Sequence, residues 1–252
     1  MHSGTLEYFV QAANHKDHSQ SFSIFDAGTA KIHARSDRWL RTFSEGTQRT
    51  YAYHLVDHLR WLKAVNASEE TVSIEDLRRY MALCGAEHAG PLGSPWLDAP
   101  LSASALQVRA AVLKGYYLDV TARDRINDEL NKQLTETRLP TRALKDKQFL
   151  AHVSGLEVPA NPLAAAAPRR HPRLLPDGVA AALIDSVNTA RDRMVVTWLN
   201  DSGIRVGELC GLHHADLHLR SDHECGEERL AHFHVVKRSN PNRARAKRGQ
   251  PA

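Results

Sequence analysis

The sequence predicts a mainly α-helical protein in two parts, joined by a linker rich in proline and arginine. Apolar residues recur at helical spacing in both halves, and five of the 11 prolines crowd into residues 159–176. Only 6% of the residues are aromatic, which favours aliphatic packing. A chain of 252 residues commonly forms two domains, because domains usually hold roughly 100 to 200 residues.

The first half is expected to be an all-α bundle over residues 35–158, after a poorly ordered polar lead over residues 1–34. Within residues 47–65 an apolar stripe runs from Tyr51 to Leu62 at helical steps. A second stripe runs from Leu106 to Val120, after a loop rich in glycine and proline.

Two further helices are expected in this half. Ser73 and Asp76 have the spacing of a capping box, which predicts a helix starting at residue 74. Another helix is predicted within residues 139–153.

Residues 159–176 are predicted to form an extended linker, since proline removes a backbone donor and fixes φ. In residues 177–252 helical spacing resumes, and Gly203 is expected to end the second helix in a left-handed cap. A short helix with Val206 and Leu209 should follow. Strands at 217–219 and 229–236 then predict a β-hairpin.

Charge and composition reduce the number of functional classes that fit the sequence. The net charge is +4, yet the sequence from Leu230 onward carries no acidic residue. A basic tail of this kind suits a phosphate-rich partner, and a solvated terminus is the alternative. Neither a signal peptide nor an apolar run long enough to span a membrane is evident, so we expect a cytoplasmic protein with no membrane partner.

No metal and no cofactor are predicted. The three cysteines are far apart, which suggests neither a disulfide framework nor a paired zinc motif and fits a reducing compartment. Eight histidines and cysteines lie beyond residue 209, but their spacing matches no known zinc pattern. They are His213, His214, His218, His223, His232, His234, Cys210 and Cys225.

The segment Ser202–Leu212, Ser-Gly-Ile-Arg-Val-Gly-Glu-Leu-Cys-Gly-Leu, carries the most specific pattern. It resembles the first catalytic box of the tyrosine recombinases, or phage-type integrases, whose form is Thr-Gly-Leu-Arg-x-x-Glu-Leu-x-x-Leu followed by an acidic residue. The likeness extends more weakly from about residue 35 to the last residue. It implies a SAM-like helical core-binding domain that grips DNA, followed by part of an α+β catalytic domain.

The resemblance also implies roles for single residues. A guanidinium offers paired donors that match phosphate oxygens, so Arg205 would stabilise the transition state of phosphodiester transfer. Glu208 would hold Arg205 or its backbone in place. Lys247 matches the family's general-acid lysine in a hairpin turn, with Lys237 as the alternative. Contacts to double-stranded DNA are expected from nine basic residues, namely Arg49, Arg60, Arg169, Arg170, Arg173, Lys237, Arg238, Arg243 and Arg245.

The family also needs a tyrosine nucleophile and a His-x-x-Arg box, and the sequence shows neither after Arg205. All six tyrosines lie before the linker, at Tyr8, Tyr51, Tyr53, Tyr80, Tyr116 and Tyr117. We therefore expect a truncated or frameshifted recombinase that binds DNA but lacks cleavage activity alone. Residues from about 178 onward should be marginally stable in isolation.

Two alternatives remain open. One is an accessory protein that binds DNA or intact recombinase protomers without chemistry. The other is an unrelated helical interaction module with a basic tail.

Overall fold

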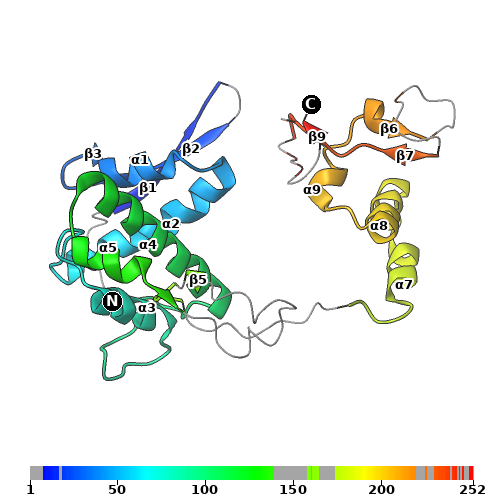
Figure 1. Ribbon diagram of the computed structural model, residues 1–252. Coiled ribbons are helices and arrows are strands. Elements are labelled where there is room, and N and C mark those ends of the chain that lie inside the picture. The colour runs from blue at the N-terminus through cyan, green and yellow to red at the C-terminus, as the bar shows by residue number, and fades with distance from the viewer. Residues whose placement is uncertain are drawn as a thin grey trace, which may run out of the picture. The chain divides into compact units, whose positions relative to one another are not determined.

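The computed structural model of the chain divides into two compact units, residues 1–169 and 170–252 (Figure 1). The division falls inside the stretch predicted to be a linker. The described residues are 8–16, 19–138, 158–159, 161–164, 174–219, 225, 230–238, 240–242, 244, 246 and 250–251. The helix predicted within residues 139–153 lies outside them.

Unit 1 is largely helical, which confirms the mainly α prediction. Its described helices are α1 (Ala34–Leu40), α2 (Glu45–Ala64), α3 (Ile74–Gly85), α4 (Ala103–Asp124) and α5 (Asp128–Thr135). The capping box predicted at the start of α3 is present, because Ser73 accepts from the Asp76 amide and Asp76 accepts from the Ser73 amide. The helix predicted around Leu106 begins at Ala103, and Ser102 caps it.

The prediction that residues 1–34 form a poorly ordered lead was wrong, because most of residues 8–32 form an antiparallel sheet. Its strands are β1 (Tyr8–Asn14), β2 (Gln20–Asp26) and β3 (Lys31–Ile32), in that order. In β2, polar and apolar residues alternate, so Phe22 and Ile24 both point into the core and are buried. The Phe22 amide donates to Gln48 Oε1 on α2 at 2.7 Å, which ties the sheet to the bundle.

The core of unit 1 is aromatic as well as aliphatic, which the low aromatic content did not predict. Trp61, Tyr80, Tyr116 and Tyr117 are among its largest fully buried side chains. The aromatic residues of the chain are therefore few but concentrated in one core, where each removes a large apolar area from water.

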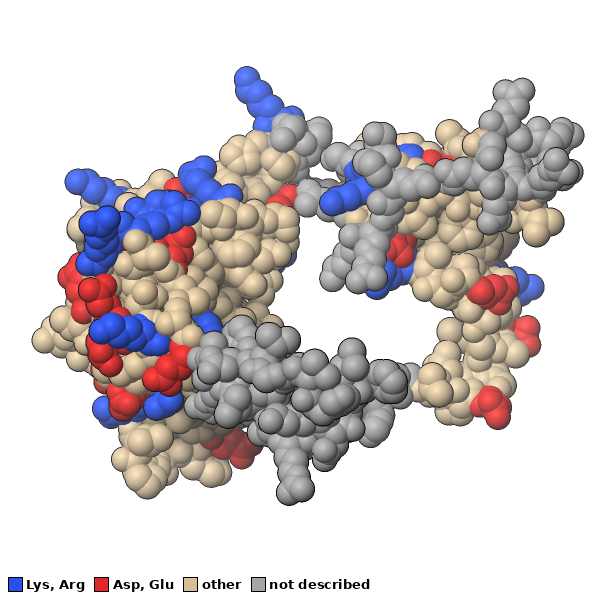
Figure 2. Space-filling view, viewed as in Figure 1, with Lys and Arg blue, Asp and Glu red and all other residues tan. Residues whose placement is uncertain are grey.

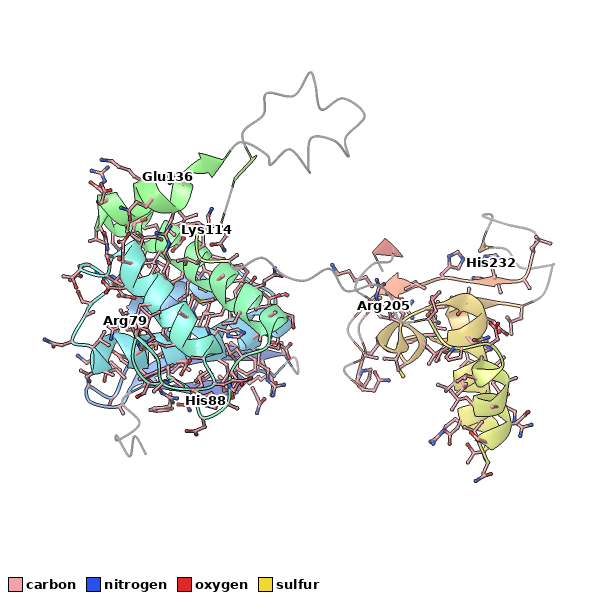
Figure 3. All side chains as sticks on the ribbon, turned by 90° about the horizontal axis from the view of Figure 1, so that it is seen from below. Arg79, His88, Lys114, Glu136, Arg205 and His232 are labelled. Atoms are coloured by element: carbon pink, nitrogen blue, oxygen red, sulfur yellow. The ribbon has the colours of Figure 1, made fainter. Side chains whose placement is uncertain are left out.

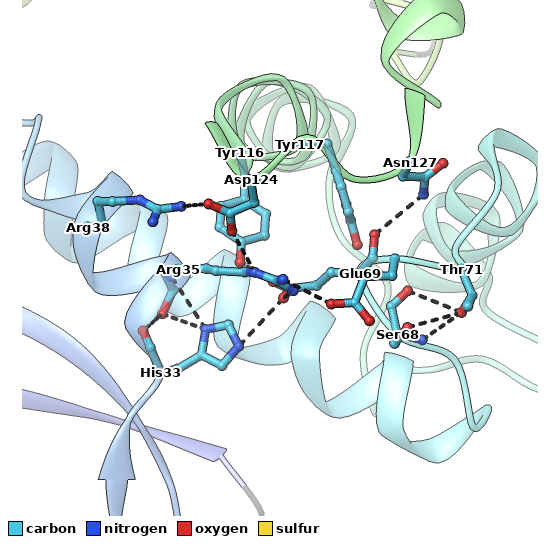
Figure 4. Close-up of polar contacts among 12 residues, drawn as sticks. His33, Arg35, Arg38, Ser68, Glu69, Thr71, Tyr116, Tyr117, Asp124 and Asn127 are labelled. Carbon is cyan, nitrogen blue, oxygen red and sulfur yellow. Dashed lines mark hydrogen bonds and ion pairs between the residues drawn. The ribbon is translucent and has the colours of Figure 1, made fainter. Parts of the chain in front are cut away.

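Two polar networks cross unit 1. In the first, the buried Arg109 guanidinium lies 2.6 Å from Asp57, which also accepts hydrogen bonds from Tyr80 and Trp96. In the second, Arg35 reaches both Glu69 and Asp124, at 2.9 Å and 2.8 Å (Figure 4). Arg35 thereby joins α1 to the segment after α2 and to the end of α4.

A short antiparallel ladder also belongs to unit 1. Its strands are β4 (Thr137–Arg138) and β5 (Val158–Pro159), which pair through Thr137 and Pro159. Just beyond β5, Leu163 is buried in the unit 1 core. The predicted linker therefore begins within this unit.

Unit 2 is built from short elements. Its helices are α7 (Val179–Ser186), α8 (Ala190–Ser202), α9 (Val206–Leu209) and the 3₁₀ turn η1 (His214–Asp216). Its strands are β6 (Leu217–His218), β7 (His232–Phe233), β8 (Val236–Lys237) and β9 (Gln250–Pro251). The predicted hairpin is present but shorter than expected, as the antiparallel pair β6 and β7. Strands β8 and β9 pair in parallel.

No helix in the described part of the chain is both long enough and apolar enough to cross a membrane.

Candidate functional site

The segment that carries the recombinase-like pattern begins where α8 ends. Gly203 has φ of 65°, and its amide donates to Leu199 O, so α8 closes with the predicted left-handed glycine cap. A Cβ at Gly203 would meet nothing within 4 Å, so the backbone conformation rather than close packing favours glycine here. The chain leaves α8 and presents Arg205 as the residue that caps α9.

Glu208 holds Arg205 through both of its carboxylate oxygens. Oε2 accepts from the Arg205 backbone amide at 2.9 Å, and Oε1 accepts from Arg205 Nη1 at 3.1 Å. The amide donor, followed by the guanidinium, lowers the pKa of the Glu208 carboxyl, which keeps it ionised. Glu208 therefore contacts both the backbone and the side chain of Arg205, and its role at a phosphate stays a prediction.

Arg205 is fixed on one edge and open on the other. Its side chain is 60% exposed, whereas that of Glu208 is 7% exposed. Within the described residues, Nε and Nη2 of Arg205 make no hydrogen bond, and the side chain lies at the surface of unit 2 (Figure 3). A guanidinium positioned in this way can donate to the oxygens of a phosphate without giving up its carboxylate anchor.

A second pair of a carboxylate and an arginine, which the sequence did not predict, involves the segment after α9. Asp216 is buried and pairs through both oxygens with Arg238, and it also accepts from the His213 amide at 2.7 Å. Burial alone would raise the pKa of Asp216, but the bonds from Arg238 and His213 outweigh it and lower the pKa. Asp216 is the first acidic residue after the Ser202–Leu212 segment.

The start of the basic tail packs against the residues that follow α9. Asn240 lies 2.8 Å from His213 Nε2, and Asn242 donates to Cys210 O at 2.9 Å. Gly211 leaves room for this contact, because a Cβ there would come within 3.0 Å of the Asn240 amide nitrogen. Asn240 and Asn242 therefore bring the described part of the tail against the end of the Arg205 segment.

The remaining predicted DNA contacts fall into three groups. Arg49 on α2 and Lys237 on β8 are exposed. Arg60 and Arg238 have internal roles, since Arg60 Nε donates to Tyr8 O at 2.8 Å and Arg238 pairs with Asp216. Six predicted residues lie outside the described residues, namely Arg169, Arg170, Arg173, Arg243, Arg245 and Lys247.

Basic and acidic side chains are interspersed on the face of unit 1 seen in Figure 2. Arginines on α1 and at its C-terminal end are paired, as Arg38 binds Asp124 and Arg41 binds Asp37. Much of the positive charge of α1 is thus neutralised locally, which distinguishes it from the open edge of Arg205.

Four of the eight histidines and cysteines beyond residue 209 lie close together in space, although their spacing along the sequence matches no zinc pattern. The ligand atoms of His218, Cys225, His232 and His234 all lie within 4.8 Å of one another. Sequence spacing could not show this, because the hairpin pairing of β6 with β7 brings the residues together.

No family model, curated protein or solved structure matches the chain.

Proposed function

We propose that this chain is the DNA-binding portion of a site-specific tyrosine recombinase, with Arg205 as the residue that grips the phosphodiester to be exchanged. In the intact family the reaction is DNA integration and recombination by strand breakage and rejoining. The proposal includes unit 1 as a SAM-like core-binding domain, although its N-terminal sheet is an addition to the all-α bundle that the resemblance implied.

The observation that carries the proposal is that Glu208 holds Arg205 in place. Glu208 binds both the amide and the guanidinium of Arg205, while Nε and Nη2 make no hydrogen bond in the described part of the chain and the side chain is 60% exposed. A structural ion pair needs no such preorganisation, whereas catalysis at a phosphate depends on donors already in place.

The chemistry available to these residues stops short of cleavage. Tyr80, Tyr116 and Tyr117 are buried in unit 1, and no tyrosine follows Arg205 in this sequence. Cleavage in the family's manner would need a tyrosine from outside this sequence. Lys247 as general acid, with Lys237 as the alternative, remains part of the proposal.

A second candidate is a non-catalytic protein that binds DNA or intact recombinase protomers, a role that uses the same basic residues and needs no nucleophile. Both candidates keep the same DNA contacts. They separate in a mixing experiment, because only the accessory role predicts that the chain changes the strand exchange carried out by an intact recombinase.

Duplex DNA binding by the full chain tests the proposal. Fluorescence anisotropy with a labelled random-sequence duplex should show binding that weakens at least about tenfold between about 50 mM and about 200 mM salt, since phosphate contacts release counterions. Replacing Lys237, Arg243, Arg245 and Lys247 together by glutamine should reduce both the affinity and its salt dependence.

A matched control replaces four basic residues of unit 1 that the proposal does not use, Lys31, Arg78, Lys132 and Arg123, by glutamine. This variant removes the same charge, so it should weaken binding less than the tail variant. Absence of duplex affinity at low salt, or equal losses in the two variants, would contradict the proposal.

A further inference from the structure

The β6–β7 hairpin gathers three imidazoles on one face. Its register places Leu217 opposite Phe233 and His218 opposite His232. Residues two apart along a strand share a face, so His234 follows His232 on the side of His218. The His234 amide donates to Asp216 O at 2.9 Å, which extends the pairing by one step.

The opposite face of the hairpin is apolar. Phe233 stacks on Trp198 of α8 with ring centroids 5.6 Å apart. This contact fixes which face of the short hairpin packs on the helix, and the three histidines therefore lie on the other one. On that face, the His218 ring centroid lies 5.1 Å from that of His232 and 4.9 Å from that of His234.

Cys225 supplies a thiol to the same point. Its Sγ lies 3.2 Å from His232 Nε2, and His232 Nε2 lies 3.2 Å from His234 Nε2. In a tetrahedral zinc site with bonds of about 2.0–2.3 Å, neighbouring ligand atoms are about 3.3–3.6 Å apart. The four ligand atoms lie within 4.8 Å of one another, so small side-chain rotations would complete such a site.

The tautomer of His232 is also set for metal binding. Its Nδ1 lies 2.7 Å from Leu230 O, a carbonyl that can only accept, so Nδ1 carries the proton. In the neutral ring Nε2 then holds the lone pair, and it points at Cys225 and His234. A backbone carbonyl that orients a histidine in this way is the usual support of a metal ligand.

A bound metal would stabilise unit 2, whose described residues bury little apolar surface. Among its described residues, the only buried hydrophobic side chain is that of Ala246, and the other buried side chains are Glu208, Asp216 and Asn240. Small domains with too little apolar core are commonly stabilised by a metal or by disulfides. A bound metal would tie Cys225 to both strands of the hairpin.

We propose that His218, Cys225, His232 and His234 bind one Zn²⁺ as a structural site. Three imidazoles and one thiolate suit this borderline-soft ion, and four protein ligands leave no open position for catalysis. Binding requires the Cys225 thiol to lose its proton, so zinc uptake releases protons and weakens as the pH falls. This site is separate from Arg205 and independent of the proposed DNA binding.

Cobalt and zinc titrations of the metal-free full chain test the site. Co²⁺ should produce the visible bands of a tetrahedral centre and a near-ultraviolet thiolate-to-cobalt band, and one equivalent of Zn²⁺ should abolish both. Cys225→Ser should remove the thiolate band and lower zinc affinity by at least about 100-fold, because losing a ligand exceeds the cost of losing a residue that only orients one.

Two matched variants complete the experiment. Cys210 is an exposed thiol and His214 an exposed imidazole in the same unit, so Cys210→Ser and His214→Ala should keep the spectrum of the unaltered chain. His232→Ala should lose the tetrahedral bands. The proposal is overturned if the unaltered chain shows no thiolate band with Co²⁺, a result that does not depend on any variant folding. It is equally overturned if Cys225→Ser and Cys210→Ser give the same spectrum.

Discussion

Unit 1 and unit 2 are stabilised by different kinds of contact. Unit 1 buries large aromatic side chains such as Trp61 and Tyr117 and adds charged networks within that core. Unit 2 buries almost no apolar side chain in its described residues. Instead, individual ion pairs, such as Glu208 with Arg205 and Asp216 with Arg238, stabilise it. The first unit resembles a self-sufficient domain, whereas the second depends on individual polar contacts.

The contrast shows where function and stability separate. Arg205 and the four proposed metal ligands all lie in unit 2, the unit with the smaller apolar core. Sites that must move or bind are commonly found in the less stable parts of a protein. The same polar groups therefore position the site and support the local fold, so mutations in unit 2 should affect both at once.

The largest effect is expected from breaking the buried ion pair of unit 1. Asp57→Ala leaves the Arg109 guanidinium, which is 5% exposed, without its carboxylate. We expect a loss of about 3–5 kcal/mol in the free energy of unfolding, since an unpaired buried charge is costly. Urea denaturation followed by tryptophan fluorescence measures it. The exposed Asp98→Ala in the same unit serves as control, and equal effects would show that the pair is unimportant.

A second comparison sets one apolar truncation in each unit side by side. Ile24→Ala, in strand β2 with 0% exposure, should cost about 2–5 kcal/mol. Leu183→Ala in α7, which is 47% exposed, should cost no more than about 0.5 kcal/mol. Similar losses in the two variants would mean that the N-terminal sheet is not part of the unit 1 core.

Acid should destabilise unit 1 through its buried histidines. Burial, followed by the nearby Arg109 charge, lowers the pKa of His58 to about 3 and that of His54 to about 4, from an ordinary value of 6.5. The unfolded chain therefore takes up protons first, and stability falls as the pH drops below 6.5 towards these values.

For His58 alone the loss between about pH 7 and about pH 5 should be on the order of 2 kcal/mol. His54→Asn, which keeps a hydrogen-bond acceptor for Arg109, should reduce the acid sensitivity of the unfolding midpoint. A midpoint in urea that stays constant over this range would argue against both neutral histidines.

A smaller effect than those in the unit 1 core is expected from breaking the Asp216–Arg238 pair of unit 2. Asp216→Ala removes the partner of Arg238, but that side chain is 19% exposed and can be rehydrated. We expect a local loss of about 1–2 kcal/mol, seen as faster limited proteolysis of residues 170–252 with no change in the urea midpoint of unit 1. A change in unit 1 unfolding would show that the two units are energetically coupled.

Local signals in the sequence predicted the local features. The Ser73 cap, the Gly203 helix end and the Glu208 contact to Arg205 each depend on residues within four positions, and all three are present. The N-terminal sheet was missed because the alternation in β2 covers only a few residues. Long-range pairings, such as Arg109 with Asp57 or Arg238 with Asp216, leave no mark in local spacing.

The cysteine and histidine cluster illustrates the same limit. The spacing of His218 and Cys225 fits no zinc motif, but the cross-strand register pairs His218 with His232, and the Cys225 thiol lies close to both. Only the pairing of the strands, which depends on packing against Trp198, reveals the site.

The central claim is that Arg205 grips a DNA phosphate through a guanidinium fork. The most direct test measures duplex affinity of the full chain against salt for Arg205→Ala and Arg205→Lys. Arg193→Ala is the matched control, an exposed arginine on α8. Arg205→Ala should lower the affinity by about tenfold or more and reduce the salt slope by about 1, while Arg205→Lys should keep the slope but lose affinity. If Arg205→Ala and Arg193→Ala bind DNA equally well, the claim is wrong.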